Sequence, residues 1–175
     1  RSFVLPEDLT GEIRASVFMT GALISRFGLA EIIRPGGCNI GARPIDIHIE
    51  AFKSLKIGVT EGERITFDGT KASSGNVTLG YPSVGATENA VMAAVRLRGT
   101  TVIHNCAEEP EIIDLQNYLN MLGAKVKGAG GRTITVEGVE KLKSGEIEFT
   151  PRRDRIEAGT YLLCGVCVGG EIEFD

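Results

Sequence analysis

Hydrophobic residues recur along the chain in three segments that follow one plan. Each segment is an apolar run with helical spacing, then a glycine, then a short alternating stretch typical of a strand. The segments are MTGALISRFGLAEII, NAVMAAVRLRGTTVI and TYLLCGVCVGGEIEF, and their turn glycines, Gly28, Gly99 and Gly170, lie 71 residues apart. A fixed period of this kind indicates an internal structural repeat.

A second helix and strand follow each of the first two segments. PIDIHIEAFKSL precedes RITFDG, and PEIIDLQNYLNML precedes RTITVEG, with closing glycines Gly69 and Gly138 that lie 69 residues apart. Both strand segments alternate apolar and polar residues, as half-buried strands do. The later helix carries an apolar stripe at a spacing of three and four residues, formed by Ile112, Leu115, Leu119 and Leu122.

Each unit is therefore predicted to contain a helix, a strand, a helix and a strand, with further short strands at NVTLG and EIEFT. Pro44 and Pro110 stand where the second helix of each unit is expected to start. Proline is tolerated there because the first N–H of a helix has no helical partner. We expect a repeated mixed α/β (α+β) architecture, and the periodicity leaves open whether the sheets lie outside or inside the helices.

Composition narrows the class of protein. The 175 residues, 42% of them hydrophobic, suffice for a core in one domain or slightly more. A net charge of −4 with interspersed signs argues against nucleic-acid binding, and no stretch approaches the roughly 18 apolar residues of a membrane span. Four cysteines are too sparse for a disulfide scaffold, and RSFVLPEDL lacks the pattern of a secretion signal.

These features predict a cytoplasmic protein with reduced thiols and no membrane or nucleic-acid partner. The chain begins at Arg1 rather than at a methionine, and it stops within the apparent strand GGEIEFD. We therefore expect it to be a fragment of something longer.

The stretch RPGGCNIGARPIDIH places Cys38 among three glycines, with Arg34 and Arg43 nearby. Glycines permit backbone angles closed to other residues, so the loop can approach a ligand closely. A reactive thiol needs exposure and a positive neighbourhood, which the arginines could supply. The alternative is that Cys38 is a small buried hydrophobic residue in a turn.

Charged and titratable residues follow this cysteine. Arg43 stands before the expected helix, where a guanidinium beside unpaired N–H groups makes a site for carboxylate or phosphate. Asp46 lies in the first helical turn and is equally explained as a favourable partner of the helix dipole. His48 could be a functional group or a structural residue with satisfied hydrogen bonds.

A second candidate is YPSVGATEN, which precedes an apolar helix. Ser83, Gly85 and Thr87 could direct hydroxyls and backbone amides at one phosphate. Ordinary N-capping of the helix explains the same residues and is the simpler interpretation.

Other polar motifs are weaker. Cys164 and Cys167 have redox-motif spacing, but they lie inside an apolar run where both sulfurs are expected to fill the core. Glu109 and Glu111 flank Pro110 and could act as acid or base, or could be routine first-turn acids. The basic stretch RRDRIEAGT, residues 152–160, could mark a domain junction.

Four motifs, GGCNIGARPID, PSVGATEN, EPEIID with LGAKV, and DRIEAGTYL, occur in the order found in one enzyme family. Together they resemble the UDP-N-acetylglucosamine enolpyruvyl transferases, from around Arg14 to the end of the chain. The resemblance implies an inside-out α/β barrel (a prism) of two domains, each built from βαβαββ units like those of EPSP synthase. Residues 1–152 would be most of one domain without its start, and residues 153–175 the beginning of the next repeat or second domain.

The resemblance also implies an activity. It is the transfer of the enolpyruvyl group of phosphoenolpyruvate to the 3-hydroxyl of UDP-N-acetylglucosamine with release of phosphate, the committing step of bacterial peptidoglycan synthesis. The reaction would pass through a tetrahedral adduct and would need no metal or organic cofactor.

The same resemblance assigns roles to residues. Cys38 would be the proton donor on a closing loop and the site of covalent attachment by phosphoenolpyruvate or by fosfomycin, and Arg43 would contact the phosphate or carboxylate at the reacting centre. The residues implied to bind substrate are Arg14, Arg43, Pro44, Ile45, Asp46, Ile47, Tyr81, Pro82, Ser83 and Val84. Tyr81 and Pro82 depart from the family's lysine-containing form, and Arg152 and Arg153 form an insertion.

The family's Lys-Asn pair and its presumed aspartate base would lie beyond the two ends of this chain. The 175-residue piece is therefore predicted to be inactive alone. The alternatives are a shikimate-pathway enolpyruvyl transferase, which lacks the GGCxIGxRP loop, and an RNA 3′-phosphate cyclase, which would need a more basic surface. A non-catalytic binding domain and a thiol-redox protein using Cys164 and Cys167 also remain.

Overall fold

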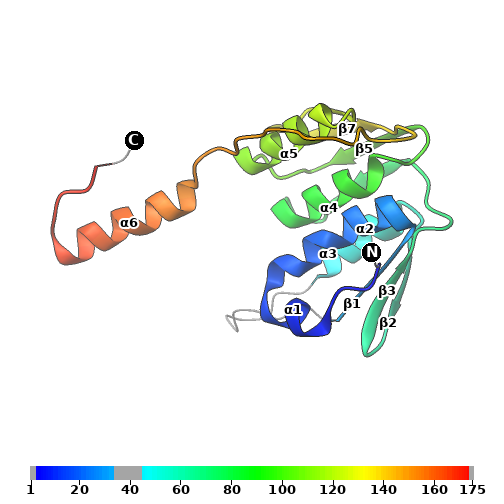
Figure 1. Cartoon of the computed structure of the whole chain (residues 1–175), viewed down its shortest axis with the longest axis horizontal. Helices are drawn as coiled ribbons and strands as arrows, with labels where there is room; N and C mark the ends of the chain where they lie inside the picture. The colour runs from blue at the N-terminus through cyan, green and yellow to red at the C-terminus, as the bar shows by residue number, and fades with distance from the viewer. Residues whose placement is uncertain (1–2, 34–44, 174–175) are drawn as a thin grey trace.

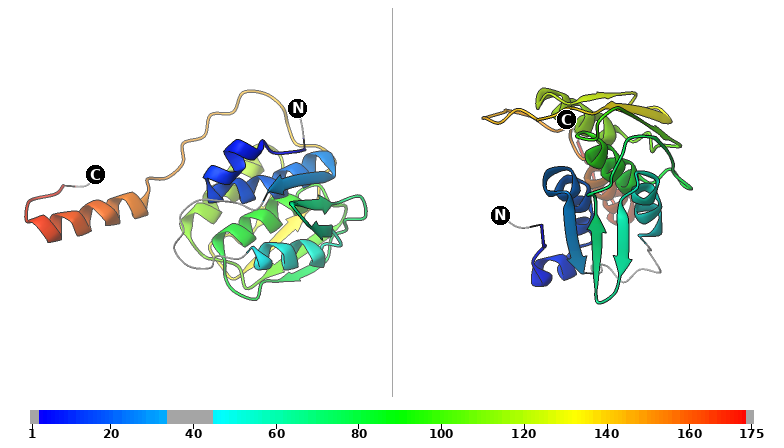
Figure 2. Two further views of the ribbon diagram at one scale, coloured as in Figure 1. Left: turned by 90° about the horizontal axis from the view of Figure 1, so that it is seen from below. Right: turned by 90° about the vertical axis from the view of Figure 1, so that its right-hand side faces the viewer.

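The chain forms a two-sheet body from which one helix extends (Figure 1). The computed structural model describes residues 3–33 and 45–173. The helix that extends is α6 (Arg155–Val168), and it lies apart from the body in Figure 1 and in the left view of Figure 2. The chain enters the body through α1 (Glu7–Glu12) and a 3₁₀ helix, η1 (Arg14–Phe18).

The first repeat unit forms a three-stranded antiparallel sheet with two helices. Its elements are α2 (Met19–Phe27), β1 (Leu29–Ile33), α3 (Asp46–Ser54), β2 (Gly58–Glu61) and β3 (Arg64–Asp68). The strand order is β1-β3-β2, and Ala30 and Val59 both lie opposite Phe67. Buried residues alternate along β1 and β3, so one face of the sheet lies against the helices.

The second unit repeats this plan with one more strand. Its elements are β4 (Asn76–Thr78), α4 (Val84–Ala94), β5 (Thr100–His104), α5 (Pro110–Met121), β6 (Lys125–Lys127) and β7 (Thr133–Glu137). The strand order is β4-β5-β7-β6, with β4 parallel to β5 and the other pairs antiparallel. In the first unit, the counterpart of β4 is a single parallel bridge from Val4 to Glu31.

The repeat read from the glycines is confirmed in atomic detail. Gly28 and Gly99 have positive φ angles of 73° and 96°, and each lies between the first helix of its unit and the strand that follows. Their carbonyls accept equivalent hydrogen bonds from Gly69 N and Gly138 N, at 2.7 and 2.9 Å. Equivalent residues therefore do equivalent structural work 71 and 69 positions apart.

The helices lie in the middle of the body and the sheets lie against them (Figure 1). Helix α4 packs against α2, α3 and α5, and eight of its 11 residues are buried. The core continues into the first sheet, where the Phe52 and Phe67 rings meet edge to face at 5.2 Å. This arrangement answers the question that periodicity left open.

Two predicted strands are wrong. Residues 146–150 (EIEFT) and 171–173 have no strand structure, because no neighbouring strand among the described residues pairs with them. The first of these segments instead lies on α5, where Phe149 meets Tyr118 edge to face at 5.4 Å. Near the second, α6 is capped by Gly169 rather than by Gly170, one residue earlier than the period predicts.

The expected burial of Cys164 and Cys167 is also wrong. Both are exposed, and α6 has no buried residue. An apolar pattern predicts which face of a helix tends to be buried. Whether that face is covered depends on the elements that pack against it. The division of the chain at residues 152 and 153 stays a prediction.

Candidate functional site

The predicted site residues fall into two groups. Cys38, Arg43 and Pro44 lie outside the described residues. The remaining predicted residues lie on η1, at the start of α3 and at the start of α4, namely Arg14, Ile45, Asp46, Ile47, Tyr81, Pro82, Ser83 and Val84. Helix α3 begins at Asp46, with Ile45 as its N-cap.

The structure brings these three elements together. A β-carbon at Gly85, next to Val84, would lie 2.3 Å from Cε1 of Phe18 in η1 and 3.1 Å from Cε1 of His48 in α3. Gly85 therefore lets η1, α3 and α4 meet at a point where no larger residue fits.

A buried amide sits at the centre of this meeting point. Asn89 of α4 is 0% exposed, and its Nδ2 donates to Val17 O at 3.0 Å and to His48 Nδ1 at 2.9 Å. Its Oδ1 accepts from Gly21 N at 2.8 Å, near the start of α2. We call Val17, Gly21, His48 and Asn89 the seam cluster, because they join the two repeat units.

The seam cluster holds His48 in its neutral form. Burial, and after it the charge of Arg14, lower the pKa of His48 to about 4, and the charge of Asp46 opposes this shift. Because Nδ1 accepts the hydrogen bond from Asn89, the proton of the neutral ring is on Nε2. The interpretation of His48 as a structural residue with satisfied bonds is supported, and the electrostatic influence of Arg14 and Asp46 places two predicted site residues beside it.

The hydroxyls of the PSVGATEN motif act as structural groups. Ser83 Oγ accepts from Ala86 N at 3.3 Å and caps α4. Thr87 Oγ1 donates to Ser83 O at 2.8 Å and accepts from Ala107 N at 3.1 Å. N-capping, the simpler of the two interpretations, is confirmed. Tyr81, by contrast, is 64% exposed at the surface.

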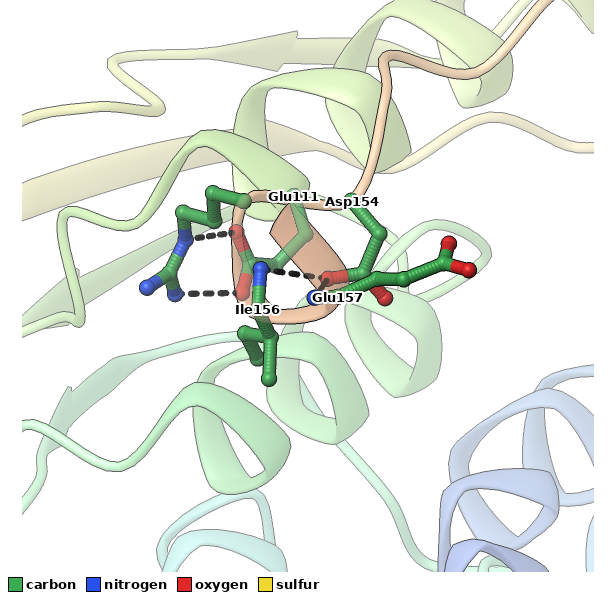
Figure 3. Close-up of polar contacts among 5 residues, drawn as sticks. Glu111, Asp154, Ile156 and Glu157 are labelled. Carbon is green, nitrogen blue, oxygen red and sulfur yellow. Dashed lines mark hydrogen bonds and ion pairs between the residues drawn. The ribbon is translucent and has the colours of Figure 1, made fainter. Parts of the chain in front are cut away.

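A second polar cluster lies where the segment that leads into α6 contacts α5, and its α6 side is drawn in Figure 3. Both carboxylate oxygens of Glu111 accept from the Arg155 guanidinium, at 2.7 and 3.4 Å. Asp114 accepts from Arg152 N and Nε, both at 2.9 Å. We call Glu111, Asp114, Arg152 and Arg155 the junction cluster.

The junction cluster gives the acidic residues around Pro110 a structural role. The hydrogen bond from Arg155 lowers the pKa of Glu111, so this carboxylate stays ionised and is a poor general acid. Beside it, Asp154 Oδ1 accepts from Ile156 N and Glu157 N, at 2.5 and 2.8 Å, and caps α6 (Figure 3). The basic stretch therefore contacts α5 through Arg152 and Arg155, and its role as a domain junction stays a prediction.

Glu88 is a perturbed acid that the motifs did not single out. It is half-buried on α4, and burial raises its pKa to about 7, with a further contribution from the charge of Glu111. It lies next in sequence to Asn89, between the two clusters. Its one sequence signal was an acid within an otherwise apolar helix.

A wide hollow lies elsewhere in the described part of the molecule. It has a volume of about 1110 Å³ and runs between α2, α4, α5 and residues 140–144. Its apolar lining includes Met92, Leu115 and Leu119, and none of the predicted site residues that the structure describes lies on it.

Two absences hold for the described residues alone. Among residues 3–33 and 45–173, no three His, Cys, Asp or Glu side chains gather in a way that could hold a metal ion. In the same ranges, no helix is long and apolar enough to cross a bilayer.

Comparison with known proteins gives the family. Residues 1–174 match the family of EPSP synthase (3-phosphoshikimate 1-carboxyvinyltransferase). The chain belongs to this family.

Within the family, the chain is similar to enzymes that act on UDP-N-acetylglucosamine. It is 48% identical to UDP-N-acetylglucosamine 1-carboxyvinyltransferase 1 of Caldanaerobacter subterraneus, over 95% of this chain and 40% of the relative. It is 46% identical to the enzyme of that name from Halothermothrix orenii, over 96% of this chain and 40% of the relative. The chain therefore spans about 40% of the length of these relatives.

Solved structures of the family share the fold. The enolpyruvyl transferase NikO from Streptomyces tendae superposes with a TM-score of 0.72 at 23% identity, over 92% of this chain and 38% of that one. EPSP synthase from Acinetobacter baumannii gives a TM-score of 0.57 at 17% identity, over 74% of this chain and 30% of that one. The predicted EPSP-synthase-like fold class is confirmed.

Proposed function

We propose that the protein containing this chain transfers the enolpyruvyl group of phosphoenolpyruvate to the 3-hydroxyl of UDP-N-acetylglucosamine, with release of phosphate. This step would commit precursors to peptidoglycan in the cytoplasm. The observation that carries the proposal is the similarity, 44–48% identity over 95–98% of the chain, to relatives named for this transfer.

The described residues would supply part of the nucleotide-sugar site. Arg14 offers a fixed positive charge for an anionic group, while Asp46 and Val84 lie at helix starts that the seam cluster holds together. Helix starts present unpaired backbone N–H groups, which suit the phosphates and carbonyls of a uridine nucleotide. Convergence of three such segments around one buried amide supports a binding role.

The chemistry itself would depend on residues 38 and 43. The thiol of Cys38 would donate a proton to the methylene carbon of phosphoenolpyruvate, which makes the adjacent carbon electrophilic toward the sugar hydroxyl. The guanidinium of Arg43 would stabilise negative charge on the phosphate or carboxylate as transfer proceeds. Both roles follow from the resemblance of the GGCNIGARPID motif, and both are proposals.

The complete activity would need more protein than these 175 residues, because the relatives are about two and a half times as long. The Lys-Asn pair and the aspartate base would come from the rest of the longer chain. We therefore propose that the 175-residue piece alone is inactive.

Phosphate release by the full-length protein tests the proposed function. Release from phosphoenolpyruvate that requires UDP-N-acetylglucosamine supports it. Release that requires shikimate 3-phosphate instead would assign the protein to the shikimate-pathway branch of the family. No release of phosphate with either acceptor would favour a non-catalytic binding domain.

Fosfomycin labelling tests the role of Cys38, with internal controls in the same chain. We expect mass spectrometry to find the adduct on Cys38 and not on Cys164 or Cys167, although these two thiols are exposed. Cys106 should also stay unlabelled, because burial raises its pKa to about 11. Equal labelling of Cys38 and the two α6 thiols would show that exposure alone, and not a built site, governs reactivity.

A further inference from the structure

We infer that Asn89 is the positioning residue of the nucleotide-sugar site: one buried amide joins η1, α2 and α3 to α4 and fixes the direction in which His48 presents its N–H. This inference rests on the proposed function and deepens it. Asn89 itself touches no substrate in this proposal and acts through the segments that it holds.

The geometry of Asn89 leaves little freedom. Its amide nitrogen has two protons, which go to Val17 O and His48 Nδ1, and its oxygen accepts from Gly21 N. Each partner lies on a different element, and the partners are 72, 41 and 68 residues away in sequence. A side chain with two donors and one acceptor on the same planar group is what this site requires.

Each of these contacts reaches a segment that carries a predicted substrate residue or adjoins one. Val17 shares η1 with Arg14, His48 lies in the first turn of α3 with Asp46, and Asn89 follows Val84 on α4. Moving the amide would shift these three segments relative to one another. The seam cluster therefore sets the shape of the site from beneath.

Close packing shows that the contact is built to fit. A β-carbon at Gly21 would lie 2.5 Å from Asn89 O and 2.8 Å from Asn89 Oδ1. The backbones of α2 and α4 can approach this closely only because position 21 has no side chain. The hydrogen bond from Gly21 N to Oδ1 depends on that approach.

The tautomer of His48 follows from the same amide. Asn89 can only donate to Nδ1, because its amide nitrogen makes this contact and has no acceptor lone pair, and the bond from Gly21 N fixes which end of the amide is the oxygen. The charged groups that act on the imidazole are Arg14 from η1 and Asp46 from α3, while α4 contributes the uncharged Asn89. The ring is thus held neutral with its proton on Nε2, where it can serve as a donor.

Replacing the amide by a carboxylate reverses this arrangement. Asn89→Asp keeps the shape and can still accept from Gly21 N, but it has no proton to donate to Val17 O or to His48. The imidazole would then place a proton on Nδ1 and donate it to the carboxylate, and the added negative charge would raise the pKa of His48. The matched control is Asn120→Asp, because Asn120 makes a similar pair of bonds with Val126 N and O, both 2.8 Å, and touches no histidine.

Ring ¹⁵N chemical shifts measure the tautomer directly. The chain has two histidines, so His104 serves as an internal reference. In the wild-type chain we expect His48 to show a protonated Nε2 and an unprotonated Nδ1 at pH 7. Asn89→Asp should show a protonated Nδ1, and Asn120→Asp should match the wild type.

The outcomes separate the inference from the proposed function. A wild-type His48 protonated on Nδ1, or an Asn89→Asp ring unchanged from wild type, overturns the inference. The wild-type measurement decides the point even if Asn89→Asp fails to fold.

Affinity for UDP-N-acetylglucosamine, measured by titration calorimetry on the full-length protein, completes the test. We expect Asn89→Asp to weaken binding at least about tenfold and Asn120→Asp to leave it unchanged. If the wild type binds UDP-N-acetylglucosamine and Asn89→Asp binds it with the same affinity, the positioning role of Asn89 is overturned and the proposed function is not. Absence of wild-type binding overturns the proposed function, and the positioning role falls with it.

Discussion

The seam cluster and the junction cluster are both held by side-chain hydrogen bonds between distant segments, but they differ in charge and in exposure to solvent. In the seam cluster, uncharged groups meet where water is excluded, and Asn89 is 0% exposed. In the junction cluster, full charges meet at the surface, where Arg155 is 51% exposed. By formal charge alone, the contacts of the junction cluster would be the more stabilising ones. The exclusion of water makes the contacts of the seam cluster contribute more to stability.

The difference teaches that solvent decides the worth of a polar contact. A buried amide that loses a partner cannot turn to water, so each lost bond costs about 1–3 kcal/mol. An exposed guanidinium and carboxylate keep most of their hydration when they separate, and salt screens their attraction. We therefore expect changes in the seam cluster to alter stability strongly and changes in the junction cluster to alter it little.

The largest effect should come from Gly21→Ala. The new methyl group would collide with the backbone oxygen of Asn89, so α2 and α4 would have to separate. We expect a loss of about 3 kcal/mol in the free energy of unfolding, measured by urea titration. Gly159→Ala is the control, because no atom lies within 4 Å of its added methyl. If both variants kept wild-type stability, close packing of the seam would be disproved.

The next largest effect is the acid sensitivity caused by His48. Its pKa of about 4 in the fold is below its unfolded value of 6.5, so between these values the unfolded chain binds a proton that the folded chain does not. The contribution of His48 to stability is therefore fully present above pH 6.5 and is lost as the pH drops toward 4, by about 3 kcal/mol in total. His48→Gln should flatten this part of the curve of unfolding free energy against pH. An unchanged curve would show that His48 does not titrate as a buried base.

Glu88 should act in the opposite direction and with a smaller magnitude. Its pKa of about 7 in the fold is above the unfolded value of 4.5, so folding retains a proton that the unfolded chain has released. The contribution of Glu88 therefore lowers stability as the pH rises from 4.5 to 7, by about 2 kcal/mol after allowance for its partial exposure.

Glu88→Gln should remove this loss and raise stability at pH 8. Because the slopes of Glu88 and His48 have opposite signs between pH 4.5 and 6.5, the wild-type curve hides both of them. The single variants should each reveal the slope of the other residue. If Glu88→Gln gave the same curve of unfolding free energy against pH as the wild type, the carboxyl group of Glu88 would be solvated in the fold.

The smallest effect should come from Arg155→Ala. We expect no measurable change in the unfolding of the body, because the ion pair with Glu111 is exposed. The charge of Glu111 would then act on Glu88 without compensation, so the pKa of Glu88, followed by carboxyl ¹³C NMR, should rise. Lys143→Ala is a control that removes a positive charge away from Glu111. A large loss of stability in Arg155→Ala would contradict the comparison between the clusters.

The sequence was informative wherever a pattern is local. The glycine period predicted the two repeat units, and PSVGATEN predicted the cap at Ser83, because caps and turns depend on neighbouring residues. The seam cluster could not be predicted in the same way. Asn89 and His48 are 41 residues apart, and only the packing of α3 on α4 brings them within 2.9 Å.

The wrong predictions have the same physical origin. EIEFT alternates like a strand, but a strand requires a partner, and residues 146–150 lie on α5 instead. Cys164 and Cys167 sit in an apolar helix that nothing in the described structure covers. Glu88 was missed because its pKa depends on burial and on Glu111, which lies 23 residues further along the chain.

The missing β-carbons at Gly21 and Gly85 have a mechanical consequence. Where side chains separate two helices, a small displacement of one helix can be absorbed by a change of rotamer. Here the backbone at Gly21 lies directly against Asn89, and the backbone at Gly85 lies directly against Phe18 and His48. The glycines contribute no side chain that could change its rotamer. If a ligand displaced the start of α3 or α4, α2 would therefore have to move by a similar amount. The two repeat units would then move together as one rigid body.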